Sequence, residues 1–246
     1  VLPTPVRGER REERPIRFAI LGRPNAGKST LLNRLLNEDR AVVSDIPGTT
    51  RDSIDCDFAV DGVKFVVTDT AGLRKKAKVE DEVEIFSNMR TLESIRRSDV
   101  SVLMVDCTRG LEVQDFRIIT EIRKAGKGLV LVLNKWDIFP DKTEKSFDHM
   151  VKEMLEREPM LEYVPIISAS AKEGQRVNRI VQAIQTVSAN CRRVLGRDRV
   201  AESFANFLQE KAPPSHNARA VSLTRACQVM VEPPVIAIGT RPPALV

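Results

Sequence analysis

The sequence is poor in aromatic residues, in cysteine and in long apolar runs. Aromatic side chains make up 4% of its 246 residues, so the core must be built from Val, Ile, Leu and Ala. The four cysteines lie far apart without a CxxC pair, which argues against a structural zinc site or a disulfide framework and fits a reducing cytoplasmic environment. No apolar run approaches the roughly 18 residues of a membrane span, so the sequence predicts a soluble protein.

Charge is abundant but unevenly spread. The chain is 30% charged and 42% hydrophobic, which excludes a wholly disordered protein. Residues 16–191 hold 27 charges of each sign, whereas residues 192–246 hold eight basic and four acidic side chains. A basic segment beside a neutral one indicates either a polyanionic partner such as nucleic acid or a solvated basic face, and charge alone leaves both open.

The sequence divides into three segments. Residues 1–15 are charged, contain three prolines and read as a linker. Residues 16–191 alternate strand and helix patterns, which predicts an α/β fold with a mixed, mostly parallel sheet and helices on both faces. The Asp61-Gly62 pair predicts a two-residue hairpin. Residues 192–246 read as a small α+β unit.

The expected elements follow from these patterns. Strands are expected at 16–22, 53–60, 63–69, 99–106, 128–134, 163–168, 218–231 and 234–240. Helices are expected at 28–37, 82–97, 112–125, 143–157, 175–190 and 201–214.

A phosphate-binding loop is the strongest motif. The segment GRPNAGKS matches GxxxxGK[ST] and stands between a predicted strand and a predicted helix. Its backbone N–H groups would surround phosphates, Lys28 would reach the β- and γ-phosphates, and Ser29 would offer a hydroxyl to Mg²⁺. The predicted contact residues are Gly22, Arg23, Pro24, Asn25, Ala26, Gly27, Lys28, Ser29 and Thr30.

Two further segments suit a γ-phosphate and its metal ion. Asp69-Thr70-Ala71-Gly72 follows an apolar strand, so Asp69 could hold Mg²⁺ through water and Gly72 could donate its N–H to the γ-phosphate. In SDIPGTTRD (44–52), Thr49 or Thr50 could complete the Mg²⁺ shell; we favour Thr50, although the sequence does not decide between them. Loops ordered by a γ-phosphate and released on hydrolysis form a switch, and residues 73–82 would be its second mobile segment.

Two segments near the later strands suit a guanine base. In Asn134-Lys135-Trp136-Asp137, the Asp137 carboxylate could accept two hydrogen bonds from guanine, which adenine cannot supply. Asn134 and Lys135 would brace this loop, whereas Trp136 fits packing better than chemistry. Backbone N–H groups of Ser170-Ala171-Lys172 could reach the guanine O6.

In this order, GRPNAGKS, PGTTRD, DTAGLR, NKWD and SAK resemble the Era/TrmE/EngA group of bacterial GTPases. RKKAKVEDEVE and ACQVMVEPPVIAIG make the sequence most similar to the second G domain of the EngA (Der) family and to part of its KH-like domain. The resemblance implies a linker (1–15), a GTPase domain (16–191) and an incomplete KH-like domain (192–246), in a fragment without the first G domain. The KH-like segment lacks GxxG, so its usual clamp on nucleotides is in doubt.

The resemblance also implies a role in large-subunit ribosome assembly. Its partners would be GTP or GDP, the 50S subunit or pre-rRNA, and the absent G domain, with neither membrane nor DNA involved. Leu73 stands where a Ras-type enzyme has glutamine, so a K⁺ ion held partly by Asn25 is expected to assist hydrolysis. The predicted catalytic residues are Lys28, Asn25, Thr50 and Gly72. The alternatives are a nucleotide-gated RNA-binding module with negligible turnover and a TrmE-like tRNA-modification GTPase.

Overall fold

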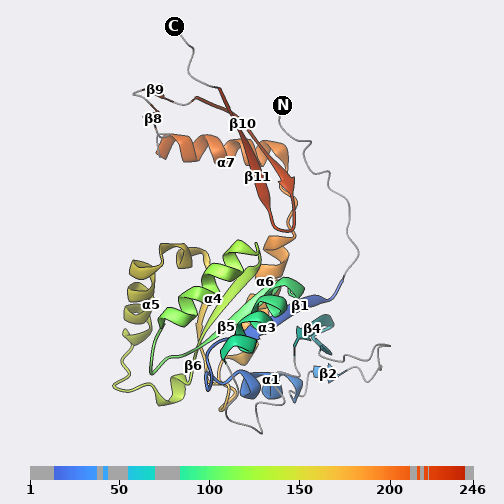
Figure 1. The fold of residues 1–246 in the computed structure, drawn as a ribbon, viewed down its shortest axis with the longest axis vertical. Coiled ribbons are helices and arrows are strands. Elements are labelled where there is room, and N and C mark those ends of the chain that lie inside the picture. Colours follow the sequence, from blue (N-terminus) through green and yellow to red (C-terminus); the bar gives the residue numbers. More distant parts are fainter. Residues whose placement is uncertain are drawn as a thin grey trace. The chain divides into compact units, whose positions relative to one another are not determined.

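A computed structural model describes residues 14–37, 41–43, 55–69, 84–210, 215–216, 219–220 and 222–241 (Figure 1). The chain separates into two compact units, one formed by residues 13–188 and the other containing the described residues after Ser188. In the described part of the chain, no helix is both long and apolar enough to cross a membrane.

The larger unit is built on a seven-stranded sheet in the order β2-β3-β4-β1-β5-β6-β7. Its strands are β1 (Ile16–Leu21), β2 (Ala41–Val43), β3 (Cys56–Val60), β4 (Val63–Thr68), β5 (Val100–Asp106), β6 (Gly128–Asn134) and β7 (Ile166–Ser168). The strands from β4 to β7 run parallel, while β3 is antiparallel to both β4 and β2. The predicted mixed, mostly parallel sheet is therefore confirmed.

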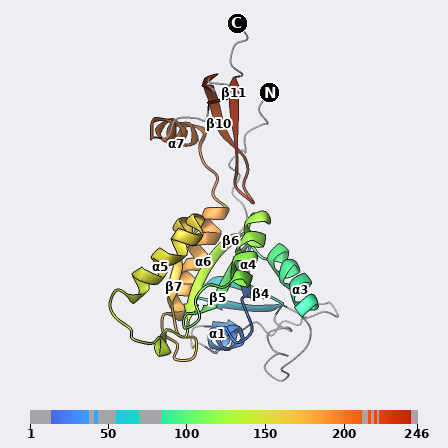
Figure 2. The ribbon, with the colours of Figure 1, turned by 60° about the vertical axis from the view of Figure 1, so that its left-hand side comes forward.

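Helices cover both faces of this sheet (Figure 2). They are α1 (Lys28–Leu36), α3 (Glu84–Arg97), α4 (Val113–Lys124), α5 (Ser146–Arg157) and α6 (Val177–Cys191), with the short 3₁₀ helices η1 (Trp136–Ile138) and η2 (Pro159–Tyr163). Side chains alternate along each strand, so Val102 and Met104 pack with α1 and α6, whereas Leu103 and Val105 pack with α3, α4 and α5. This alternation explains why β5 and β6 are buried along their whole length.

The hairpin between β3 and β4 forms at the predicted position. Asp61 and Gly62 both adopt positive φ angles, of 50° and 81°, as a tight two-residue hairpin turn requires. Some expected boundaries were wrong by three residues or more. Helix α5 begins at Ser146 rather than at residue 143, and the helix expected from residue 201 begins at Arg197. Strand β7 begins at Ile166 rather than at residue 163, because Tyr163 ends η2 and residues 164–165 are not strand.

The smaller unit contains one long helix and a two-stranded sheet. Its elements are α7 (Arg197–Glu210), β8 (Ser215–His216), β9 (Arg219–Ala220), β10 (Ser222–Met230) and β11 (Val235–Arg241). The antiparallel β10–β11 pair confirms the two expected strands, and α7 packs against β10. Buried Gln228 of β10 binds the backbone of the segment that precedes α7. Its side chain accepts a hydrogen bond from the Leu195 N–H at 2.7 Å and donates one to the Arg193 carbonyl at 3.1 Å. The KH-like character of this unit stays a prediction.

Candidate functional site

The predicted motifs meet at one edge of the larger sheet. Each follows a different strand of the parallel set: the phosphate-binding loop follows β1, Asp69 follows β4, Asn134 ends β6, and residues 170–172 follow β7. The carboxyl ends of parallel strands lie at the same edge, where ligands bind in open α/β sheets. The fold therefore gathers into one region motifs as far apart in the chain as Gly22 and Lys172.

The phosphate-binding loop needs glycine at its two ends. Gly22 has φ +137°, and a Cβ there would lie 2.3 Å from the Met104 carbonyl oxygen of β5. Gly27 has φ +96° and directly precedes α1. The Lys28 ammonium donates to the carbonyls of Gly22 and Arg23, at 2.8 and 2.6 Å, so the loop holds this cation inside its own turn.

The other residues of the loop differ in exposure. Pro24, Asn25 and Thr30 are exposed, Ser29 is half-buried and Ala26 is buried. Asn25 has φ +62°, a backbone conformation that asparagine tolerates better than most residues. The helix N-terminus that begins at Lys28 directs backbone N–H groups and partial positive charge toward this loop, which suits an anion.

Asn134 joins three parts of the site. Its side chain is buried, donates to the Ala26 carbonyl at 2.8 Å and accepts from the Ala171 N–H at 2.9 Å. A Cβ on Gly27 would lie 2.1 Å from the Asn134 amide nitrogen, so this close contact also requires glycine. The bracing role expected for Asn134 thus extends beyond its own loop to the phosphate-binding loop and to the segment after β7.

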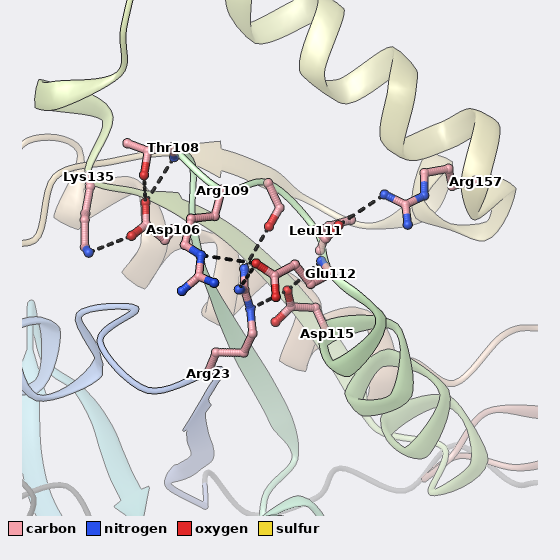
Figure 3. Close-up of polar contacts among 10 residues, drawn as sticks. Arg23, Asp106, Thr108, Arg109, Leu111, Glu112, Asp115, Lys135 and Arg157 are labelled. Atoms are coloured by element: carbon pink, nitrogen blue, oxygen red, sulfur yellow. Dashed lines mark hydrogen bonds and ion pairs between the residues drawn. The ribbon is translucent and has the colours of Figure 1, made fainter. Parts of the chain in front are cut away.

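Lys135 is oriented by an acidic residue that the sequence analysis did not select. Its ammonium lies 2.6 Å from the Asp106 carboxylate, whose other oxygen accepts hydrogen bonds from Thr108 (Figure 3). Burial raises the pKa of Asp106, but the hydrogen bonds from Lys135 and Thr108 outweigh it, and the pKa lies below its usual value. Asp106 therefore stays ionised and fixes the lysine stem beside the loop.

The next two residues of this loop differ in burial. Trp136 is buried, stacks on Phe139 at a centroid distance of 4.9 Å and meets the edge of Phe147, which agrees with its expected packing role. Asp137 follows in η1 and is exposed. The tryptophan anchors the loop in the core, so the carboxylate next to it is presented to solvent at the site.

The segment after β7 is held from two sides. Ser170 and Gln175 exchange two backbone hydrogen bonds, at 2.9 and 3.1 Å, which close a tight loop. Arg34 of α1 donates to the carbonyls of Ala171 and Lys172. Of the three N–H groups expected to reach the guanine O6, that of Ser170 donates to the Gln175 carbonyl and that of Ala171 donates to Asn134. The Lys172 side chain is exposed.

The predicted magnesium ligands are partly described. Asp69 has φ +58° and accepts a hydrogen bond from the Ser94 hydroxyl at 3.2 Å. Ser29 and Asp69 follow neighbouring parallel strands and offer a hydroxyl and a carboxylate, the hard oxygen donors that Mg²⁺ takes alongside phosphate oxygens. The predicted residues Thr49, Thr50, Thr70, Ala71, Gly72 and Leu73 lie outside the described residues.

Asp115 is a second acidic residue that sequence reasoning missed. It is fully buried in the first turn of α4 and forms an ion pair with Arg23 at 2.9 Å. Glu112 and Asp115 have the spacing of a helix capping box, which the structure confirms. That spacing could have located the start of the helix, but the link to Arg23 spans 92 residues and has no local signal.

Comparisons with known proteins agree with this geometry. The family described as "50S ribosome-binding GTPase" matches residues 17–135. GTPase Der of Gemmatimonas aurantiaca is 44% identical over 96% of this chain and 55% of its own length, and GTPase Der of Geobacillus thermodenitrificans is 38% identical over 97% and 54%. The chain thus spans about half the length of the curated relatives it matches.

A solved structure supports the fold of the larger unit. Era of Aquifex aeolicus, crystallised as a variant bound to GDP and AlF₄⁻, superposes with a TM-score of 0.51 at 26% identity. The match covers 70% of this chain and 56% of that protein. This chain thus shares the P-loop GTPase fold with Era and is similar over nearly its whole length to GTPase Der proteins.

Proposed function

We propose that this chain binds GTP with Mg²⁺ and hydrolyses it to GDP and phosphate as a molecular switch. The observation that carries the proposal is the side chain of Asn134, which ties the Ala26 carbonyl of the phosphate-binding loop to the Ala171 N–H. One buried amide thus fixes the spacing between a site suited to phosphates and a site suited to a purine base. Asp137 follows Asn134 in the chain and lies in η1, and its carboxylate would accept the hydrogen bonds that select guanine.

Each residue of the site has a distinct role in this proposal. Lys28 and the backbone N–H groups of the loop bind the β- and γ-phosphates and offset the charge that develops as the bond to the leaving oxygen breaks. Ser29, Asp69 and Thr50 would hold Mg²⁺, which supplies further positive charge at the phosphates when bound. Gly72 would donate its N–H to the γ-phosphate.

A potassium ion is part of the proposal. Leu73 cannot orient water by hydrogen bonding, so additional positive charge near the phosphates has to come from elsewhere. The exposed amide of Asn25 on the phosphate-binding loop is a suitable oxygen ligand. We expect GTP turnover to be slow and faster in K⁺ than in Na⁺ buffer, and Asn25→Ala to lose that difference. Equal turnover of the unaltered protein in both salts would contradict this role.

The cellular role we propose is assembly of the large ribosomal subunit in the cytoplasm. The family description names 50S binding, and the relatives that cover this chain are Der proteins. The basic excess of residues 192–246 is suited to rRNA. Sedimentation of the protein with 50S particles in GDP and in a non-hydrolysable GTP analogue tests it; co-sedimentation with the GTP form supports the proposal, and none in either state contradicts it.

The proposed nucleotide site is tested by removing its central cation. Lys28→Ala should abolish detectable binding of both GTP and GDP, because the loop loses the charge that its carbonyls hold in place. Lys127→Ala removes a lysine of the same unit outside the predicted motifs and serves as the control. Near-normal affinity of Lys28→Ala for either nucleotide would contradict the assignment.

Single-turnover hydrolysis separates the switch from a passive RNA-binding module. A switch should hydrolyse bound GTP faster when 50S particles are added. Tight binding of the GTP form to the particles without acceleration would favour the nucleotide-gated module instead.

A further inference from the structure

Arg23 is a buried cation inside the phosphate-binding loop. Its guanidinium is held by three groups, two from the segment that connects β5 to α4 and one from the first turn of α4 (Figure 3). Nε donates to the Asp115 carboxylate at 2.9 Å, Nη2 donates to the Gly110 carbonyl at 2.9 Å, and Nη1 forms an ion pair with Glu112. Each of the three guanidinium nitrogens therefore has a partner, and these contacts fix the orientation of the arginine side chain.

The acceptor of this bond is fixed as well. Asp115 has no exposed surface, and the oxygen that binds Arg23 also accepts the Glu112 N–H at 3.0 Å as part of the capping box of α4. Burial raises the pKa of Asp115, while the adjacent Arg23 favours the ionised form. A buried carboxylate keeps its charge only with a partner, so the pair forms a rigid link between α4 and the loop.

This link ends on the backbone that holds the phosphate-binding lysine. The backbone carbonyl of Arg23 accepts a hydrogen bond from the Lys28 ammonium at 2.6 Å. Arg23 is thus fixed by its side chain and positions Lys28 through its main chain. The neighbouring Gly22 lies against the Met104 carbonyl of β5. Side chain and backbone contacts from β5 and α4 therefore set the shape of the turn in which Lys28 lies.

We propose that Asp115 is a positioning residue for nucleotide binding, acting through Arg23 on the loop that holds Lys28. The inference rests on the proposed function, because it assumes that this loop binds the phosphates of GTP and GDP. Asp115 reaches the phosphate-binding loop through its ion pair with the Arg23 side chain. Its loss should loosen the loop and release nucleotide faster.

The test is the dissociation rate of a fluorescent GDP derivative from the complete 246-residue chain. Asp115→Asn keeps the size of the side chain and its capping interaction but removes the charge that holds Arg23. We expect dissociation to become about tenfold faster, the size of effect that a residue coupled to a site through one contact produces. Glu121→Gln makes the same chemical exchange on an exposed ion pair of the same helix, and it should leave the rate unchanged.

The rate is measured well below the melting temperature of each variant, where every molecule is folded. A residue that only stabilised the fold would lower the melting temperature without changing this rate. An unchanged dissociation rate in folded Asp115→Asn would therefore overturn the proposal.

A second variant keeps the test valid if Asp115→Asn does not fold. The pair Arg23→Met with Asp115→Leu replaces a buried ion pair by apolar side chains, an exchange that often preserves stability. We expect it to fold and still to release GDP about tenfold faster; normal release from this folded variant would overturn the proposal. If the unaltered chain binds no guanine nucleotide, the proposed function fails instead, and that result appears before any variant is compared.

Discussion

Replacing Asn134 should damage the larger unit more than any other single amide-to-alanine exchange at the site. The side chain makes two hydrogen bonds, at 2.8 and 2.9 Å, to backbone groups of Ala26 and Ala171, both of which are buried. Each bond contributes about 1 kcal/mol net, and each backbone group left buried without a partner costs about 1–3 kcal/mol. With two such groups, Asn134→Ala should therefore lower the free energy of unfolding by roughly 2–6 kcal/mol.

The assay uses the only tryptophan of the chain. Trp136 is buried in the larger unit, so its fluorescence during urea unfolding reports on that unit. At about 2–4 °C per kcal/mol in a domain of 150–250 residues, a loss of this size lowers the melting temperature by roughly 4–24 °C. Asn178→Ala, at an exposed position of α6, is the matched control and should change stability by less than about 0.5 kcal/mol.

Asn134→Asp sharpens the same prediction. Its carboxylate can still accept the Ala171 N–H, but it places an oxygen against the Ala26 carbonyl, where the native amide donates. At neutral pH this variant should be at least as unstable as Asn134→Ala. At lower pH the protonated carboxyl can donate, so the difference from the native protein should shrink. A loss below about 1 kcal/mol in both variants, or no dependence on pH, would refute the bracing role.

Further predictions concern packing and a buried thiol. Gly22→Ala should destabilise the fold by about 1–3 kcal/mol, because its Cβ would meet the Met104 carbonyl at 2.3 Å; a wild-type melting temperature would contradict this. Leu35→Ala removes a fully buried side chain and should cost about 2–5 kcal/mol in urea unfolding, with a loss under 1 kcal/mol counting against the assigned core. Burial, aided by the charge of Asp106, raises the pKa of the Cys107 thiol from 9.0 to about 12. Because the folded state binds this proton more tightly, the resulting stability is present below pH 9.0 and lost as the pH rises toward 12. At pH 8, iodoacetamide should therefore modify half-buried Cys191 before Cys107, and the reverse order would be inconsistent with this burial.

Local patterns in the sequence predicted most of the elements. The apolar runs that became β5 and β6 are buried on both faces, so a continuous hydrophobic stretch was the correct signal for them. The expected start of β7 was wrong by three residues, because Tyr163 is the last residue of a 3₁₀ helix and residues 164–165 connect it to the strand. The three-residue strand β2 is too short to show any period.

The candidate site was predicted as motifs but not as a connected structure. Glycine and lysine positions identify the phosphate-binding loop because the chemistry demands them at fixed spacing. The contacts that fix these motifs, from Asp106 to Lys135 and from Asp115 to Arg23, join residues 29 and 92 positions apart. Such pairs depend on strand order and helix placement, which become visible only once the chain is folded.

Nucleotide competition measures whether the site selects guanine through Asp137. A fluorescent GDP derivative bound to the chain is displaced with GDP, ADP or XDP, first from the native protein and then from Asp137→Asn. We expect GDP to displace it and ADP to be weaker by on the order of 10³-fold or more, because adenine leaves the acid unpaired. We also expect Asp137→Asn to shift the preference from GDP to XDP. Equal displacement by ADP and GDP, or an unchanged preference in the variant, would show that Asp137 does not select guanine.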